Sequence, residues 1–258
     1  TVTLMVAIQR SGPPSAAEGR TNGIDLHPGG QGAWIAGLVA EFGARATICC
    51  PLGGASGAVL RPLFEAAGIE LHATRADRAN PVWVSDGPDG APATIAETET
   101  PMLDRHEVDD LLNTTLARAL ESRVCVLSGV PVTEMIDGDR YATLTRNLRR
   151  NGVIVVADLS RDLLLPVAAA GADVMKVSHE EMIGVGLAAD ASEAALTSAA
   201  RTLLERGAGS VVVSRAEQPS IAVRPGWARR LRPPPLEPVN PKGAGDAMTG
   251  ALAAALAL

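Results

Sequence analysis

Cysteine is scarce in this sequence of 258 residues: there are three, Cys49, Cys50 and Cys125. Two of them are neighbours on an apolar segment, and no Cys-x-x-Cys pair occurs. Neither a disulfide framework nor a zinc-binding pair is therefore indicated. We predict buried, reduced thiols, the usual state of cysteine in the cytosol.

Long apolar runs are also missing, since none reaches the roughly 18 residues that a membrane-spanning helix needs. Residues 1–8 lack the basic region and the cleavage site of a secretory signal. We expect a soluble, cytoplasmic protein with no membrane partner.

Positive charge is not in excess. Lysine and arginine number 23 against 29 aspartate and glutamate residues, which gives a net charge of −6. Without a basic cluster, binding to a nucleic-acid backbone is not expected. The charge balance does not exclude small anionic ligands, because backbone N–H groups bind them without net positive charge.

Short apolar segments alternate along the chain with longer segments of helical pattern. Strands are predicted at 2–8, 46–50, 123–127, 153–158, 173–177 and 210–214. Helices are predicted at 32–42, 59–67, 105–121, 134–150, 192–206 and 247–256. This alternation predicts an α/β fold with a mainly parallel central sheet and helices on both faces. A chain of this length is ordinary for one domain.

Two stretches interrupt the alternation. Residues 11–27 are rich in Gly, Pro and charged residues. Residues 80–98 contain the strand-like pieces 81–85 and 93–97, joined by Asp86-Gly87-Pro88-Asp89-Gly90, a strong turn signal. We predict that both stretches belong to a small β lid outside the main sheet, with lid segments at about 9–28 and 79–98.

The most informative segment is Gly243-Ala244-Gly245-Asp246, which leads into a helical pattern. Glycines let backbone N–H groups approach a ligand, and a helix start favours negative charge. A carboxylate beside such a bound anion can deprotonate an attacking alcohol, so the segment suits phosphoryl transfer. A simple helix N-terminus with a favourable Asp is the alternative. The Gly-x-Gly-x-x-Gly and Walker patterns are absent.

Gly243-Ala244-Gly245-Asp246 with its small-residue helix resembles the C-terminal signature of PfkB carbohydrate kinases. Gly29-Gly30-Gln31-Gly32-Ala33-Trp34-Ile35-Ala36 is similar to the Gly-Gly-Lys-Gly-x-Asn-x-Ala element of the 1-phosphofructokinase and tagatose-6-phosphate kinase branch. Leu127-Ser128-Gly129-Val130-Pro131, Asp158 and Lys176-Val177-Ser178-His179-Glu180-Glu181 follow in the family's order, the last resembling Lys-Pro-Asn-x-x-Glu. The resemblance covers nearly the whole chain.

The resemblance implies a ribokinase-like α/β/α sandwich with a β lid, formed by residues 1–258 as one domain. It also implies ATP- and Mg²⁺-dependent phosphorylation of an alcohol group on a sugar-like substrate. Asp246 would be the base and Gly243 to Gly245 the anion hole. Glu181 would act at the Mg²⁺ site through water. Lys176 and Ser214 would lie near the nucleotide, although charged residues at strand ends are usually only solvated.

The acceptor side departs from the family pattern. The resemblance places the acceptor against Gln9, Gly29, Gly30, Gln31, Trp34 and Trp83. Met5 and Gln9 replace the family's Asn and Asp, Gln31 and Trp34 replace its Lys and Asn, and Ala79 and Trp83 replace the Arg and Lys of the lid. Each change removes a charge or hydrogen-bonding group that a phosphosugar needs, at about 1.5–3 kcal/mol per charge-assisted contact. Ordinary 1-phosphofructokinase activity is therefore not expected.

Trp34 and Trp83 both map to this acceptor region, although the chain has only three tryptophans. One hypothesis is a stacking wall for an unphosphorylated or aromatic-bearing alcohol, such as a nucleoside or sugar derivative. The other is that both residues fill core or lid space.

The nucleotide side departs as well. The segment 214–219 lacks the glycines of the family's loop, Ser178 replaces an Asn, and the sequence ends before the further helices of family members. An active kinase with altered acceptor choice is favoured over a non-enzymatic ligand- or partner-binding protein on the same scaffold. A homodimer through the lid is expected from the resemblance, and because exposed strand edges need covering.

Overall fold

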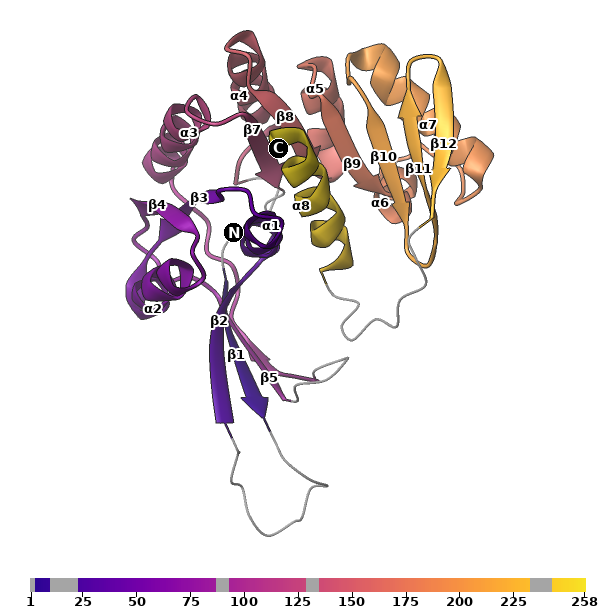
Figure 1. Ribbon diagram of the computed structural model, residues 1–258. Helices are drawn as coiled ribbons and strands as arrows, with labels where there is room; N and C mark the ends of the chain where they lie inside the picture. The colour runs from indigo at the N-terminus through magenta and orange to yellow at the C-terminus, as the bar shows by residue number, and fades with distance from the viewer. Residues whose placement is uncertain (1–2, 10–22, 87–92, 129–134, 233–242) are drawn as a thin grey trace, which may run out of the picture. The chain divides into compact units, whose positions relative to one another are not determined.

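The computed structural model of the chain describes residues 3–9, 23–86, 93–128, 135–232 and 243–258 (Figure 1). The chain divides into two compact units. Unit 1 comprises Thr1–Leu111 and Glu237–Ala247, and unit 2 comprises Leu112–Leu236 and Met248–Leu258. That the whole chain acts as one kinase domain stays a prediction.

Unit 1 contains a four-stranded sheet in the order β2-β1-β5-β6, called the lid sheet. Its strands are β1 (Thr3–Gln9), β2 (Gly23–Gly29), β5 (Val82–Asp86) and β6 (Ala93–Glu97). β1 pairs antiparallel with β2 and parallel with β5. The two predicted lid segments supply β2, β5 and β6, but their residues 10–22 and 87–92 lie outside the described part. The alternation had placed the strands at 2–8 and 46–50 in the main sheet, and this was wrong: β1 is a lid strand, and residues 47–52 belong to a separate two-stranded sheet.

The core of unit 1 lies around a two-stranded parallel sheet of β3 (Thr47–Leu52) and β4 (Glu70–Arg75). Helices α1 (Gln31–Glu41) and α2 (Gly54–Ala66) contribute Ala33, Leu60 and Phe64 to this core, and the last two are fully buried. The predicted start of α2 at residue 59 was wrong, since the helix begins at Gly54. The first turn was missed because residues 54–57 are small and show no apolar periodicity. Helix α3 (Arg105–Ala119) crosses from unit 1 into unit 2.

All three cysteines lie in the described part of the chain, and none of them forms a disulfide there. Cys50 and Cys125 are buried as predicted, whereas Cys49, on the opposite face of β3, is only partly buried. Burial raises the pKa of the Cys50 thiol to about 12.

Unit 2 contains a six-stranded sheet in the order β12-β11-β10-β9-β8-β7. The strands from β7 to β10 are parallel, whereas β11 and β12 extend the sheet by antiparallel pairing. Their bounds are β7 (Val124–Ser128), β8 (Ile154–Asp158), β9 (Val174–Ser178), β10 (Val211–Arg215), β11 (Gln218–Arg224) and β12 (Trp227–Leu231). The parallel part confirms the predicted strands to within two residues, and β11 and β12 were not predicted.

Helices cover both faces of this sheet (Figure 1). On one face, Met248, Leu252 and Leu256 of α8 (Ala244–Ala257) pack against a cluster that includes Val156 and Val174. Val155 and Ala157 alternate with Val156 along β8 and are fully buried on the other face. That face contacts α4 (Gly138–Arg150) and α7 (Glu193–Arg206), with α5 (Leu164–Ala169) packed beside them. The short elements are η1 (Arg161–Leu163) and α6 (His179–Gly184).

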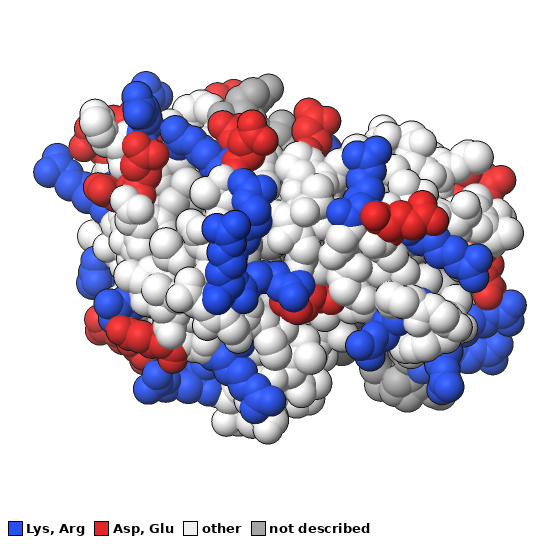
Figure 2. All heavy atoms as spheres, turned by 90° about the horizontal axis from the view of Figure 1, so that it is seen from above, with Lys and Arg blue, Asp and Glu red and all other residues white. Residues whose placement is uncertain are grey.

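The described surface carries charges of both signs. On the face shown in Figure 2, Lys and Arg side chains are interspersed with Asp and Glu. Among the described helices, none has both the length and the apolar character needed to cross a bilayer.

Candidate functional site

The first turn of α8 carries the predicted catalytic residues. Gly243 has a φ of +86°, a conformation that favours glycine, and its carbonyl accepts a hydrogen bond from Ala247 N at 2.8 Å. The helix therefore begins at Ala244, three residues earlier than predicted, and Asp246 lies within its first turn. Ala244 and Gly245 are helical residues rather than part of a preceding loop. Lys242 lies outside the described residues.

A buried polar cluster lies inside unit 2, below the carboxyl ends of β8 and β9. Lys176 Nζ contacts both carboxylate oxygens of Asp158, at 3.1 and 3.3 Å. Thr249 Oγ1 of α8 donates to Asp158 Oδ2 at 2.6 Å. The side chains of Asp158 and Lys176 are only 2% and 7% exposed, so the two charges neutralise each other away from water.

The sequence did not predict the contacts of Asp158 with Lys176 and Thr249. The resemblance places Lys176 near the nucleotide, which stays a prediction, and the alternative of a solvated strand end is wrong because its ammonium group is buried and paired with Asp158. Thr249 was not singled out. A hydroxyl within an otherwise apolar helix was the available signal, because buried hydroxyls need partners.

Ser178 and Glu181 form a capping box at the start of α6. Glu181 Oε2 accepts from Ser178 N at 2.7 Å, and Ser178 Oγ accepts from Glu181 N at 3.1 Å. The Ser-x-x-Glu spacing signals this motif in the sequence. The capping box holds Glu181 at the carboxyl end of β9.

Ser214 lies beside Ser178 in the register of β10 and β9. The segment that follows Ser214 is not a loop: β10 and β11 form a hairpin in which Arg215 pairs with Gln218. Ala216, in the turn, has a φ of +48°. Unit 2 therefore brings together Asp158, Lys176, Glu181 and Ser214 near the carboxyl ends of its parallel strands, where ligands bind in open α/β sheets.

The predicted acceptor residues gather in unit 1. The chain turns at Gly30, with a φ of +89°, between β2 and α1, and Gln31 is the first residue of α1. Trp34 on α1 contacts the ring of His27 on β2, with ring centroids 5.8 Å apart. His27 was not predicted as a site residue. Its face of the sheet could have been inferred from the alternation of side chains along β2.

The lid strands hold the remaining acceptor residues. Met5 on β1 is opposed by His27 on β2 and by Trp83 on β5. Gly29 ends β2, and Gln9 ends β1. The structure thus places the described members of the predicted acceptor set on adjacent elements of one unit. No group of three or more His, Cys, Asp or Glu side chains among the described residues could hold a metal ion.

The sequence profile described as "pfkB family carbohydrate kinase" matches residues 5–258. A 1-phosphofructokinase of Xanthomonas campestris pv. campestris is 28% identical over 249 residues, which are 92% of this chain and 76% of that protein. An ATP-dependent 6-phosphofructokinase isozyme 2 of Mycobacterium tuberculosis is 27% identical over 243 residues, or 89% and 68% of the two chains.

Solved structures show the same fold. Phosphofructokinase-2 from Escherichia coli in complex with potassium superposes with a TM-score of 0.81 at 23% identity, covering 100% of this chain and 83% of that one. The same enzyme in complex with fructose-6-phosphate gives a TM-score of 0.79 at 23% identity, with 100% and 84% covered. The ribokinase-like α/β fold predicted from the sequence is thereby confirmed.

Proposed function

The chain belongs to the PfkB family of carbohydrate kinases, and from this we propose that it transfers the γ-phosphoryl group of ATP to an alcohol group of a sugar-like substrate. The carrying observation is the start of α8, where positive-φ Gly243 precedes a helix with Asp246 in its first turn. We further propose that the acceptor is not that of an ordinary 1-phosphofructokinase.

In the proposed reaction Asp246 accepts the proton of the acceptor hydroxyl. The oxygen then forms a bond to the γ-phosphorus as the bond from that phosphorus to the β,γ-bridging oxygen breaks, so that ADP leaves. The backbone N–H groups of residues 243–245 would stabilise charge on the moving phosphoryl group. A helix start suits this role because its dipole favours negative charge.

The residues of unit 2 fit a nucleotide with Mg²⁺. The cation, when bound, would neutralise phosphate charge. Glu181 would hold its water, which suits a single carboxylate and a cation that retains most of its hydration shell. Glu181 is already oriented by its bond from Ser178 N. Ser214 would lie near the nucleotide, and Lys176, with two contacts to Asp158, would offer its third N–H.

Steady-state ADP formation with a panel of sugars, sugar derivatives and nucleosides tests this proposal. Turnover in the parent protein, lost at least a hundredfold in Asp246→Asn, would support it, since a positioned base contributes about 10²–10⁴-fold. No turnover with any acceptor, together with no rise in melting temperature on adding Mg·ATP, would favour a non-enzymatic binding protein.

We also propose a homodimer through the lid sheet. β2 is an edge strand of that sheet, and its Ile24 and Leu26 side chains are 62% and 44% exposed. Exposed apolar side chains on a strand edge mark an association surface. Light scattering should give a dimer mass, and Ile24→Lys with Leu26→Lys should give the monomer; a monomeric parent protein would refute this proposal.

A further inference from the structure

One face of the lid sheet carries a row of side chains that phosphoryl transfer alone does not require. His27, Met5 and Trp83 are direct neighbours across β2, β1 and β5. Directly opposed residues in a sheet point to the same face. Val6 and Val82, which alternate with them, pack against the core of unit 1. The row therefore lies on the face turned away from that core.

Trp34 extends the row from helix α1. Its ring meets the His27 ring at an interplanar angle of 63°, an edge-to-face contact. Trp34 is 43% exposed, and His27, Met5 and Trp83 are partly exposed. We call Met5, His27, Trp34 and Trp83 the aromatic row. Accessible aromatic surface gathered in one place is typical of a ligand-binding surface rather than of a core.

The aromatic row is held in place before any ligand arrives. Trp83 Nε1 donates to Thr94 Oγ1 at 3.0 Å, which orients the indole. A Cβ at Gly29 would overlap the Met5 side chain, so glycine at this position makes room for the thioether. Side chains fixed in this way lose little entropy on binding.

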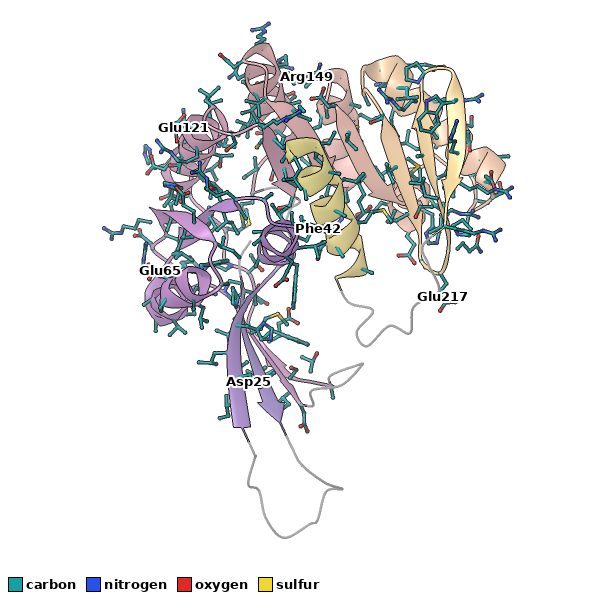
Figure 3. The ribbon with its side chains drawn as sticks, viewed as in Figure 1. Asp25, Phe42, Glu65, Glu121, Arg149 and Glu217 are labelled. Atoms are coloured by element: carbon teal, nitrogen blue, oxygen red, sulfur yellow. The ribbon has the colours of Figure 1, made fainter. Side chains whose placement is uncertain are left out.

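The charge of the surrounding elements argues against a phosphorylated acceptor. β1, β2, β5, β6 and α1 contain no Lys or Arg in their described residues. The lid strands instead carry Asp25, Asp86 and Glu97. Asp25, labelled in Figure 3, is opposed to Ala7 and Glu97 to Trp83, so both carboxylates share the face of the aromatic row. On these described elements a phosphate dianion would find no Lys or Arg side chain with which to form an ion pair.

We propose that the aromatic row binds a planar ring carried by an uncharged acceptor alcohol. The ring stacks on the indoles of Trp34 and Trp83, while Met5 supplies a polarisable contact. This inference rests on the proposed kinase function and names its acceptor class: an alcohol with an aromatic or heteroaromatic substituent and no phosphate.

Calorimetric titration of the full chain without ATP tests the inference. The probes are phenyl and methyl β-D-ribosides, phenyl and methyl fructosides, uridine and fructose 6-phosphate. We expect at least one phenyl glycoside to bind about fivefold to a hundredfold more tightly than its methyl counterpart, the range that stacking on aromatic side chains provides. Equal affinities within both pairs, tighter binding of fructose 6-phosphate, or binding of no probe would overturn the inference.

Tryptophan variants locate the binding. Trp34→Leu and Trp83→Leu should each remove most of the preference for phenyl, and Trp83→Phe, which keeps a flat ring, should retain it if the fold is intact. Trp227→Leu is the matched control, because Trp227 is 39% exposed on β12 of unit 2. A preference for phenyl unaffected by Trp34→Leu and Trp83→Leu would contradict the assignment.

Binding and catalysis fail independently in this design. A ring preference without ADP formation would refute the kinase proposal and leave the ring site standing. ADP formation with fructose 6-phosphate as the best acceptor would refute the ring site and leave the kinase standing.

Discussion

Asp158 illustrates how a few buried atoms can fix a helix. Taking an ion pair out of water costs several kcal/mol per ion unless good geometry and further hydrogen bonds offset it. Lys176 provides the opposite charge and Thr249 the further bond, at 2.6 Å. Because Thr249 lies on α8, this bond ties the helix that begins beside Asp246 to the end of β8.

Replacing Thr249 by valine keeps the shape and removes the hydroxyl. A hydrogen bond to a charged group contributes about 1.5–3 kcal/mol, so we expect Thr249→Val to lower the free energy of unfolding by that amount. Urea denaturation measures it. Thr202→Val is the matched control, since Thr202 Oγ1 donates to the uncharged Ser198 O, at 3.3 Å, on a more exposed helix face. If both variants lost the same free energy of unfolding, the hydrogen bond to Asp158 would contribute no more than an ordinary one.

Local sequence predicts some site residues better than others. The capping box of Ser178 and Glu181 spans three residues and is readable from spacing alone. Asp158 and Thr249 are separated by 91 positions, so no local pattern joins them. The ion pair of Lys176 with Asp158 was not predicted either, because the two residues come from different strands.

At the scale of elements, the β10–β11 hairpin departs from ideal turn chemistry. Ala216 adopts a φ of +48°, a conformation in which a Cβ is unfavourable. Glycine adopts it freely, and the hairpin turns that match strand twist favour glycine for this reason. The alanine therefore stores a small amount of strain at the end of β10.

Ala216→Gly should relieve that strain. We expect the free energy of unfolding to rise by about 0.5–1 kcal/mol, the strain removed less the entropy that glycine adds to the unfolded chain. Ala228→Gly is the control, because Ala228 is exposed on β12 and is not among the positive-φ residues. Thermal unfolding compares the two. A loss of stability at both positions would mean that the turn is unstrained.

Strands were predicted correctly from the sequence where burial alone determines their pattern of apolar residues. The apolar strands β7 to β10 were predicted to within two residues because both of their faces are covered. β12 is exposed along its length and begins Trp-Ala-Arg-Arg, so it shows no such pattern. The assignment of β1 to the lid depends on pairing with β2 and β5, which no single segment encodes.

At the scale of the molecule, alkaline pH should destabilise the fold because each unit buries a weakly acidic group, a thiol in one and a phenol in the other. Burial raises the pKa of Cys50 in unit 1 and of Tyr141 in unit 2. Unfolding returns the Cys50 thiol to its ordinary pKa of 9.0, so above that pH the unfolded chain releases protons that the native chain retains. The free energy of unfolding should therefore fall as the pH rises from about 9 towards 12.

Urea midpoints at pH 8 and pH 10 measure this effect, with the ionic strength held constant. Cys50→Ala removes one of the two groups and should make the fall between these pH values shallower. An unchanged or steeper fall in the variant would show that Cys50 does not contribute.

The family and the fold of the whole chain could be predicted because several motifs occur in order on a compatible pattern of strands and helices. The acceptor could not be named in the same way. The surface proposed to bind it arises from the register of β2, β1 and β5 and from the contact of Trp34 with His27, which are tertiary features. Met5 and Gln31, where the family has Asn and Lys, led only to the prediction that an ordinary phosphosugar is not the acceptor.

The most direct test is a competition for ATP among alcohols, with the phosphorylated products identified by mass spectrometry. The parent protein is incubated with Mg·ATP and an equimolar mixture of uridine, phenyl and methyl glycosides, and fructose 6-phosphate, in parallel with Asp246→Asn. We predict a phosphate ester predominantly on a ring-bearing alcohol with the parent protein and none with Asp246→Asn. A product predominantly from fructose 6-phosphate, or the same products in both samples, would contradict this prediction.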